Sequence, residues 1–358
     1  MSDTLVMPAD SLLEAMKQVV RGFGSAEAEV DAVACNLVEA NLMGHDSHGI
    51  GMLPRYADAF LEGNLTPNQH VRTVLDTGSL LRLDGGSGFG QVIGREAMAM
   101  AIERAKSHGS CILGLGQSHH LGRIGAWAEQ AAAQGLVSVH FVNVVSRAIV
   151  APFGGSDARF GTNPFCAGVP LRGRDPVILD FATSVIAQGK TRVAHNKGER
   201  VAPGCLIDDR GQPTQEPRFA VVPPLGALLA FGEHKGAGLA LMCELLGGAL
   251  AAGQTQRDHD GTRRRVLNGM LSIVIDPGRL GDIEVFEAEA QAFLDWMTAS
   301  PVREGFDGVH VAGEPERRHR AQRVAEGVPV DSTTWREILQ AADRLGVDPV
   351  SVETTARG

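Results

Sequence analysis

The chain has 358 residues, with 33 Lys and Arg against 42 Asp and Glu, a net charge of -9 and 44 glycines. This length predicts two or three structural units, because single domains usually run to about 100–200 residues. The acidic balance argues against a nucleic-acid partner, since phosphate binding depends on clustered Lys and Arg. The short basic runs at residues 263–265 and 317–323 are therefore predicted to be solvated surface.

Cysteine usage and the N-terminus bear on the location of the protein. Five cysteines, an odd number without a Cys-x-x-Cys pair, are typical of a reducing compartment. The first twelve residues lack the basic and apolar segments of a signal peptide. The most apolar long run, residues 236–253, contains Glu244 and several glycines and is predicted to fall short of a membrane span. We therefore expect a soluble, cytoplasmic protein with no membrane partner.

The first seventy or so residues are predicted to be mostly helical. Apolar residues recur at helical spacing over residues 12–23 and 30–42, and a third helical stretch covers residues 54–61. Gly44 ends the second of these helices, so residues 44–50, GHDSHGI, are expected to form a short connection between helices. A last amphipathic helix is predicted at residues 334–345.

From residue 71 onward the pattern changes to that of an α/β unit. Short β-rich runs are expected at residues 71–76, 80–84, 111–116, 136–144, 176–181 and 270–276. Helices are expected at residues 93–107 and 124–134, with a buried one at 239–250. Residues 258–265 and 313–327 are polar and are predicted to be surface loops or a linker.

Residues 80–94, LLRLDGGSGFGQVIG, have the strand, glycine turn and helix of a dinucleotide-binding segment. The spacing differs, because neither Gly86-x-Gly88 nor Gly88-x-Gly90 continues into G-x-G-x-x-G. Asp84, which precedes the turn, would also repel a pyrophosphate. We interpret this segment as a structural turn.

Four polar clusters concentrate residues capable of chemistry. Residues 44–50 hold two histidines beside Ser47, whose hydroxyl could cap the helix that follows. Residues 117–122, QSHHLG, follow a predicted strand, where a neutral imidazole can polarise a carbonyl. Asp180 ends an apolar run and could orient a histidine, and residues 232–238, GEHKGAG, open a helix with a cation suited to a phosphate. Taken alone, each histidine could be structural, a metal ligand or a general acid.

In their order along the chain these motifs resemble the type-2 malate/L-lactate dehydrogenase family, and most closely its hydroxycarboxylate dehydrogenase branch. The likeness runs over HDSHG at residues 45–49, SHHLG at 118–122, PFGG and GTNP within 152–164, ILDFATS at 178–184, GK at 189–190 and HKGAGLALM at 234–242. It implies hydride transfer between a 2-hydroxy acid and its 2-oxo acid, with NAD or NADP as the cofactor. It also implies a homodimer.

The resemblance implies an α/β fold whose mixed sheet has flanking helices and binds NAD(P) without a Rossmann turn. An all-helical unit from the chain termini is expected to pack on it. The expected boundaries are a helical unit of residues 1–72, joined by the C-terminal helix within 330–358, and a sheet unit of residues 73–329.

The family likeness assigns two histidines to acid-base catalysis. The histidine of the Ser-His-Gly motif, the proposed proton donor, is His48 here, with Ser47 beside it. In some members the histidine of the H-x-G motif has this role, and that residue is His120. Asp180 is expected to orient a histidine. The residues expected at the cofactor are His120, Thr162, Asn163, Asp180, Phe181, Ala182, Thr183, Ser184, His234, Lys235, Gly313 and Glu314.

The expected substrate side departs from part of the family. Some members carry an arginine five residues after the motif serine, which suits bidentate binding of a carboxylate. This chain has Met52 there, followed by Arg55 and Tyr56, and all three are predicted to bind substrate. Met52 favours a less polar or bulkier substrate side chain, or a carboxylate bound by another cation.

Two other functions compete with this interpretation. A metal-dependent hydrolase could use His45, His48, His119 and His120, but the sequence lacks H-E-x-x-H and no metal is expected. A non-catalytic binding protein would need no proton donor, so the histidines of the SHG and HLG motifs count against it.

Overall fold

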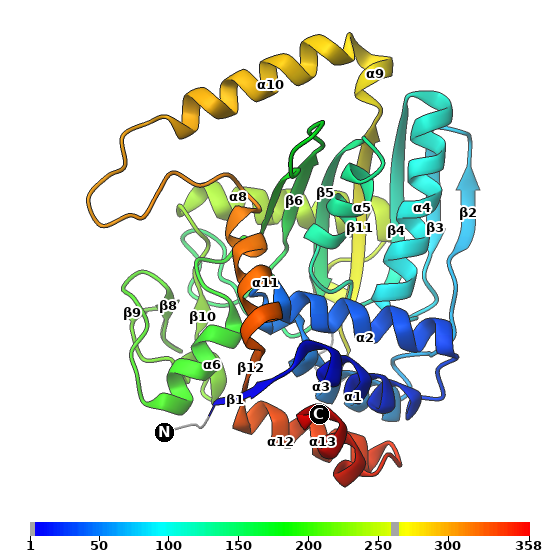
Figure 1. The fold of residues 1–358 in the computed structure, drawn as a ribbon. Helices are drawn as coiled ribbons and strands as arrows, with labels where there is room; N and C mark the ends of the chain where they lie inside the picture. Colours follow the sequence, from blue (N-terminus) through cyan, green and yellow to red (C-terminus); the bar gives the residue numbers. More distant parts are fainter. Residues whose placement is uncertain (1–3, 259–264) are drawn as a thin grey trace.

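The computed structural model describes residues 4–258 and 265–358, and a seven-stranded mixed sheet forms its centre (Figure 1). The strand order is β2-β3-β4-β11-β5-β6-β7. Strands β3 and β4 are parallel, whereas β11 runs antiparallel to both β4 and β5. The mixed α/β sheet predicted from the sequence is confirmed. The strands are β2 (Arg72–Asp76), β3 (Leu80–Asp84), β4 (Ser110–His119), β5 (Val137–Val145), β6 (Phe165–Val169), β7 (Val177–Phe181) and β11 (Leu267–Ile275).

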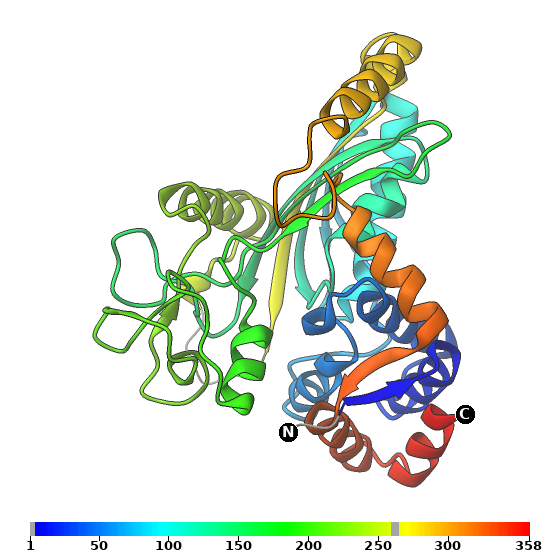
Figure 2. The same cartoon turned by 60° about the vertical axis from the view of Figure 1, so that its left-hand side comes forward.

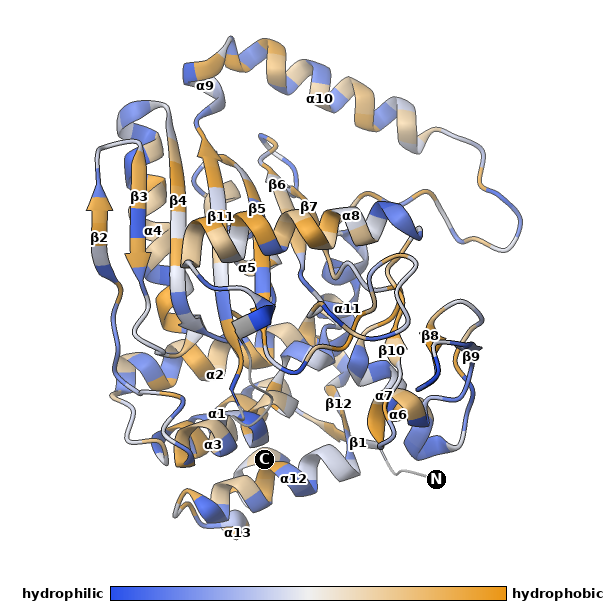
Figure 3. Ribbon diagram, turned by 180° about the vertical axis from the view of Figure 1, so that it is seen from behind, coloured by the Kyte–Doolittle hydropathy of each residue, from blue (hydrophilic) through white to orange (hydrophobic). Residues whose placement is uncertain are grey.

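Helices cover both faces of the sheet. Helices α4 (Gly90–His108) and α5 (Gly125–Ala132) pack on one face and bury an apolar core with β3 and β4. Helix α8 (His234–Cys243) continues as a π-helix, η3 (Glu244–Ala252), across the other face (Figure 3). The apolar stripes of these helices are stabilised by burial against the sheet, at about 25 cal/mol per Å² of apolar surface.

The sequence analysis predicted that the run α8–η3 is a buried helix that falls short of a membrane span, and the structure differs on both points. The run is buried on one side only, since Leu241 and Leu250 are 46% and 65% exposed. By length and composition the run His234–Ala252 could also cross a membrane, so the prediction that it falls short was wrong on those criteria. Its packing on the sheet accounts for much of its apolar character.

The two chain ends meet in one unit below the sheet (Figures 1 and 2). Its five helices share a core, in which Leu12, Met16, Leu37 and Leu53 are fully buried. They are α1 (Ala9–Arg21), α2 (Glu27–Leu42), α3 (Leu53–Leu61), α12 (Ser332–Arg344) and α13 (Pro349–Arg357). A two-stranded antiparallel ribbon, β1 (Thr4–Met7) with β12 (Val328–Asp331), joins the ends. The unit is therefore helical apart from this ribbon, which the sequence analysis missed.

The connection between α2 and α3 carries the GHDSHGI motif. It forms two 3-10 turns, η1 (Asp46–His48) and η2 (Ile50–Met52), as a short link between helices. The prediction for this segment is confirmed.

A third, smaller lobe was not foreseen because its elements are short. It contains β8 (Leu206–Ile207), β9 (Pro213–Thr214), β10 (Ala227–Leu228), α6 (Gln188–Lys197) and α7 (Arg218–Val221). Its core includes Val150, Leu206 and Leu228. Helix α6 lies against η1, because a Cβ placed on Gly189 would be 3.2 Å from the Cβ of Ser47. The lobe therefore reaches the motif loop.

Two helices that bury no residue lie between the last strand of the sheet and the C-terminal helices. After the short α9 (Pro277–Leu280), helix α10 (Ile283–Thr298) extends away from the body and has no buried residue (Figure 1). Helix α11 (Glu314–Glu326) replaces the loop predicted at residues 313–327, so that prediction was wrong. It also has no buried residue, and apolar periodicity therefore could not reveal it. The loop predicted at 258–265 falls largely outside the described residues; its first residue ends a 3-10 turn, η4 (Gln256–Asp258).

The glycine turn between β3 and α4 is a close-packing element. Its Gly85 N–H donates to the carbonyl of Gly116 on β4 at 2.9 Å. A Cβ placed on Gly90 would lie 2.1 Å from the carbonyl oxygen of His120, just beyond the end of β4. The turn thus lets helix α4 begin in contact with the chain after β4, which agrees with its interpretation as structural.

We expect Gly90→Ala to destabilise the protein by about 1–3 kcal/mol, the usual cost of forcing atoms into a packed site. The free energy of unfolding in urea measures this effect. Gly238→Ala is the matched control, because a Cβ there meets nothing within 4 Å. A Gly90→Ala protein as stable as the control would contradict the assignment.

Candidate active site

The carboxyl ends of β4 and β5 lie level at one edge of the sheet. His119 of β4 and Val145 of β5 are both paired with Leu267 of β11. Two strand spacings, about 10 Å, therefore separate these ends. The chain continues from β4 into His120 and from β5 toward Arg147. This edge brings together residues from distant parts of the sequence.

The histidines of the two sequence motifs meet at this edge. The rings of His48 and His120 stack with centroids 5.6 Å apart and planes inclined by 15°. The hydroxyl of Ser47 lies 3.0 Å from His48 Nδ1. The Ser47 hydroxyl therefore contacts the His48 imidazole. The sequence analysis suggested that this hydroxyl caps the helix that follows, but it makes no such bond.

Both histidines are held neutral by their surroundings. Burial, with smaller contributions from the charges of His45 and Arg123, lowers the pKa of His48 to about 4. Burial also places the pKa of His120 well below its ordinary value, with added repulsion from His48, His119 and Arg55. Both residues are nonetheless only partly buried in solvent-accessibility terms.

Tyr56 acts on His120 and has no exposed surface for a substrate. It is fully buried, and its hydroxyl lies 2.7 Å from His120 Nδ1. Gln91 Nε2 donates to the same hydroxyl at 2.9 Å. Met52 is also enclosed, being 6% exposed in the core of the terminal unit. In this structure neither Met52 nor Tyr56 is therefore placed to contact a substrate directly.

Arg55 is the exposed member of the predicted substrate group. Desolvation by the surrounding protein lowers the pKa of Arg55, and the positive charges of Arg192 and Arg147 lower it further. Arg192 Nη1 is 3.8 Å from Glu337 Oε2. Among the described residues, no carboxylate hydrogen-bonds to Arg55 or Arg147. Three cations from α3, α6 and the chain after β5 thus converge, and in the described part of the chain only Arg192 has a carboxylate within 4 Å, so the group retains an excess of positive charge, as in sites for anions.

The loop that carries His48 is held by helix α11 and α2. Asp46 pairs with Arg323 at 2.7 Å and accepts a hydrogen bond from Asn41 Nδ2 at 2.7 Å. Asn41 Oδ1 accepts from Ile50 N, and a Cβ on Gly49 would come within 2.0 Å of that oxygen. Gly49 is therefore needed for this packing.

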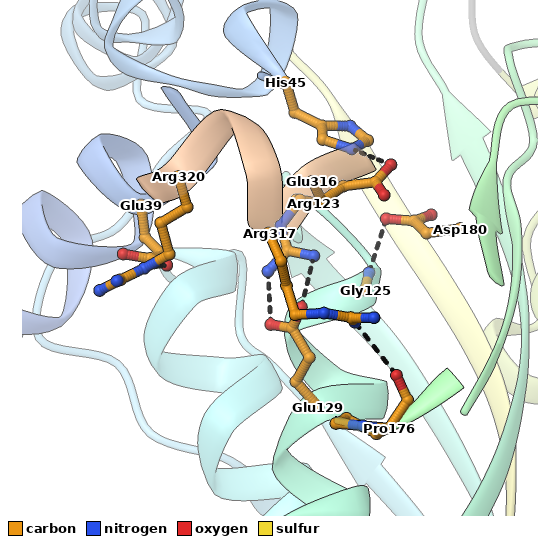
Figure 4. Close-up of polar contacts among 10 residues, drawn as sticks. All are labelled: Glu39, His45, Arg123, Gly125, Glu129, Pro176, Asp180, Glu316, Arg317 and Arg320. Atoms are coloured by element: carbon orange, nitrogen blue, oxygen red, sulfur yellow. Dashed lines mark hydrogen bonds and ion pairs between the residues drawn. The ribbon is translucent and has the colours of Figure 1, made fainter. Parts of the chain in front are cut away.

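His45 completes the attachment of the loop to α11. Its Nε2 lies 3.3 Å from Glu316 Oε1 (Figure 4). Arg317 and Arg320 of the same helix contact Pro176 O and Glu39, respectively. The basic run at 317–323, predicted to be merely solvated, thus connects α11 to the sheet unit and to the terminal unit.

Asp180 belongs to a separate polar cluster on the α5 side of β7. Its Oδ2 accepts from Gly125 N at 2.7 Å, close to the pair formed by Arg123 and Glu129 (Figure 4). Burial raises the pKa of Asp180, partly offset by His45, the Gly125 bond and Arg123. Within the described chain it makes no hydrogen bond to His48 or His120. The expectation that Asp180 orients one of these histidines is not met.

The segment after β7 runs beside the start of α8. Ser184 forms a bridge with Ala230, and Phe231 N donates to Thr183 O. The hydroxyl of Thr183 donates to Thr162 O. These bonds bring together the predicted cofactor residues of three separate motifs, 161–164, 178–184 and 234–242.

Several predicted cofactor residues face the protein interior. Asn163 is fully buried, and its amide contacts Val144 N, Ala240 O and Glu244. Phe181 packs against the rings of Phe165 and Phe231, and Ala182 follows it at the strand end. The side chain of Asn163 shapes the wall of the site, and any contact with a ligand would come from neighbouring backbone.

The start of α8 has donors that fit an anionic ligand. His234 and Lys235 are exposed in its first turn. The N–H groups of Lys235 and Gly236 already donate to Gly232 O and Phe231 O. The donors that remain are the two exposed side chains at the positive end of the helix dipole, which suit a phosphate and so fit a nicotinamide dinucleotide. Gly313 precedes α11 with a φ of 90°, and Glu314 is paired with Arg318.

Several residues of this site carried no signal in the sequence. They are Gln91, Arg123, Arg147, Arg192, Glu316 and Arg323. Gln91 is the second residue of α4, and Arg123 and Arg147 stand alone beside apolar residues. Arg192, Glu316 and Arg323 lie in polar stretches, where no spacing distinguishes them from surface residues. In the residues that the structure describes, no three His, Cys, Asp or Glu side chains are placed to hold a metal ion.

Comparison with known proteins identifies the class. The family described as malate/L-lactate dehydrogenase matches residues 7–339. Hydroxycarboxylate dehydrogenase B of Escherichia coli K12 is 48% identical over 341 residues, 95% of this chain and 94% of that protein. The L-lactate dehydrogenase of Cupriavidus necator is 40% identical over 319 residues, 88% of this chain and 91% of that protein. An E. coli structure assigned to the malate/lactate dehydrogenases superimposes with a TM-score of 0.94 at 46% identity, covering 98% of both chains.

The fold and these matches define a dehydrogenase. More particularly, the chain belongs to the malate/L-lactate dehydrogenase family. The resemblance seen in the sequence is confirmed, and nothing in the comparisons supports the hydrolase alternative.

We expect Arg323→Met to lower kcat by about 10-fold, since loosening the loop that positions His48 misaligns the site. Steady-state kinetics with a 2-oxo acid and reduced cofactor measure this change. Arg320→Met is the matched control on the same helix, because Arg320 pairs with Glu39 of α2, outside residues 44–50 (Figure 4). An equal loss of turnover in both variants would show that α11 acts only through stability.

Proposed function

We propose that the protein interconverts a 2-hydroxy acid and its 2-oxo acid, with NAD or NADP as hydride carrier. The stacked pair of His48 and His120 beside Arg55 carries this proposal. Reduction of a 2-oxo acid builds negative charge on the ketone oxygen, so it needs a proton donor and a cation for the carboxylate. The histidines supply the first and the arginines the second.

The proton is assigned to His120, with His48 as its partner. His120 is fixed by a buried hydrogen bond to Tyr56, whereas His48 bonds to the exposed Ser47. A buried partner holds the ring in one orientation better than an exposed one. His48 then holds the substrate oxygen against the His120 ring. This order differs from the sequence analysis, which placed His48 first.

The substrate carboxylate is assigned to Arg55, with Arg147 and Arg192 as neighbouring cations. An arginine without a carboxylate partner can bind a carboxylate in a bidentate fork. The enclosed Met52 leaves this task to other cations, as the sequence analysis allowed.

The cofactor is assigned to the segment 180–184, Thr162, the start of α8 and the start of α11 at Gly313 and Glu314. When bound, the nicotinamide supplies or accepts the hydride. His234 and Lys235 would bind phosphate, and the buried amide of Asn163 would keep the neighbouring backbone in place. A cytoplasmic location is part of the proposal, supported by five free cysteines.

We expect His120→Ala to lower kcat by about 10²–10⁴, the usual worth of general acid-base catalysis. His48→Ala should mainly raise KM for the oxo acid, because it removes a binding contact. A panel of 2-oxo acids, each tested with NADH and NADPH, gives both constants and the substrate preference. Cofactor binding, measured by fluorescence of the reduced nicotinamide, should change little in either variant. The reverse pattern would assign the proton to His48.

The dimer is assigned to helix α10. Phe293 and Trp296 are 59% and 74% exposed on this helix, and Val285 is 59% exposed. Apolar side chains gathered on a projecting element favour a protein interface over free solvent. A second copy of this chain is the partner that we propose.

Trp296→Glu should therefore shift the sedimentation mass from two chains to one, because a charge would be buried at the interface. Glu289→Gln, an exposed neighbour on α10, should leave the mass unchanged. Two chains in the Trp296→Glu protein would exclude this helix as the interface.

A further inference from the structure

A buried chain of hydrogen bonds runs from Gln91 through Tyr56 to His120. Gln91 is 2% exposed and Tyr56 is fully buried. Gln91 Nε2 donates to the Tyr56 hydroxyl at 2.9 Å, and that hydroxyl lies 2.7 Å from His120 Nδ1. The other amide atom, Gln91 Oε1, is buried without a hydrogen-bond partner among the described residues. A buried acceptor without a partner calls for an explanation.

The direction of these bonds determines which ring nitrogen of His120 carries the proton. A phenol has a single hydrogen to donate. Since Tyr56 receives a hydrogen from Gln91, its own hydrogen points to His120 Nδ1. Nδ1 is then the acceptor, and the neutral ring carries its proton on Nε2.

This arrangement suits binding and does not suit proton exchange. With its proton on Nε2, the ring of His120 can donate a hydrogen bond to a substrate oxygen. It cannot accept a proton there, because the Nε2 lone pair is absent. A ring that receives a proton on Nε2 must carry hydrogens on both nitrogens, so that Nδ1 becomes a donor to Tyr56.

We propose that Gln91 is a positioning residue whose amide makes a half-turn and thereby switches His120 between a hydrogen-bonding and a proton-exchanging state. After the turn, Gln91 Oε1 accepts the hydrogen of Tyr56, and the Tyr56 oxygen accepts from His120 Nδ1. The conversion is a net tautomerisation, in which Nε2 releases its proton to solvent and Nδ1 takes one up, so that His120 Nε2 is then free to take a proton. The orphaned oxygen is the acceptor that this second state uses.

The two states are balanced in hydrogen bonds. Each has one bond between Gln91 and Tyr56 and one between Tyr56 and His120, and each leaves one amide group of Gln91 unpaired. Their difference in free energy is therefore small compared with the loss of a buried hydrogen bond. Protonation of Nε2 can then decide which state is occupied.

The groups around His120 do not hold its proton permanently on one of the two ring nitrogens. Those that face it are His48, His119, Arg55 and Tyr56, and none of them is a carboxylate. A carboxylate partner would hold a proton on Nδ1 at all times, as in many catalytic histidines. Here the orientation of a neutral amide takes that role.

The inference rests on the proposed function, in which His120 exchanges the proton. In oxidation, the C–H bond of the 2-hydroxy acid breaks and its hydride passes to the oxidised nicotinamide. The hydroxyl proton passes to Nε2 of His120 in the second state, giving an imidazolium that donates from Nδ1 to Tyr56. Reduction reverses both transfers, so the protons and electrons balance.

Nitrogen-15 spectra of histidine-labelled protein test the switch without substrate. At neutral pH we expect the neutral His120 ring of the unaltered protein to carry its proton on Nε2. In Gln91→Glu, recorded above the pKa of the introduced carboxyl so that this buried side chain is ionised and can only accept, the proton should move to Nδ1. An unchanged tautomer in that variant would overturn the proposal, whichever acid is the substrate.

Kinetics provide the second measurement. In Gln91→Met, which keeps the volume but has no amide, kcat should fall about 10-fold while KM for the oxo acid stays within about two-fold. In Gln91→Glu, kcat should stay within about three-fold at its optimum, and the pH profile should shift upward because an acceptor stabilises the imidazolium. Equal losses in both variants with unchanged pH profiles would reduce Gln91 to a structural residue. If the tautomer shifts and no 2-oxo acid is reduced, the proposed function fails and the switch stands.

Discussion

The hydrogen bond between Tyr56 and His120 is the contact on which the site depends. It is 2.7 Å long, and Tyr56 lies on α3 of the terminal unit whereas His120 follows β4 of the sheet. Neither unit holds a complete site, because His48 and Arg55 belong to one and His120 and Arg147 to the other. The packing of the two units therefore creates the arrangement that the chemistry needs, and Tyr56 sets the orientation of its central ring.

Polar contacts, more than apolar packing, keep the motif loop in register with that ring. Helix α11 has no buried residue, yet it contacts the loop through Glu316 and Arg323. Exposed ion pairs contribute only about 0.2–1 kcal/mol each to stability. The main effect of these contacts is geometric, since Arg323 binds Asp46 and Glu316 contacts His45, both in the loop that carries His48. A helix can thus matter for alignment while adding little to stability.

The electrostatics of the site couple substrate binding to proton exchange. Arg192 and Arg147 lower the pKa of Arg55, and burial, with a smaller contribution from the charge of Arg55, keeps His120 neutral. A bound carboxylate would offset this positive charge and move the pKa of His120 upward toward its ordinary value. The His120 ring would then accept a proton most readily when a substrate is bound. Before a substrate binds, the ring would stay neutral.

Local patterns in the sequence determined the family, most of the sheet strands, the main helices and the two histidine motifs. Apolar spacing and glycine-flanked motifs are local properties, so they can be read without a structure. The same reasoning missed α10 and α11, because neither helix buries an apolar stripe against the body.

Only the tertiary structure decided which predicted residues reach the site. It enclosed Met52 and Tyr56, turned the side chain of Asn163 inward and placed Asp180 with Gly125 and Arg123. It also brought in Gln91, Arg147 and Arg192, which no motif marks. A side chain's direction and partners depend on how distant elements pack, and that information is spread over the whole chain. The sequence by itself determined which chemistry was available, and the packing decided which atoms could perform it.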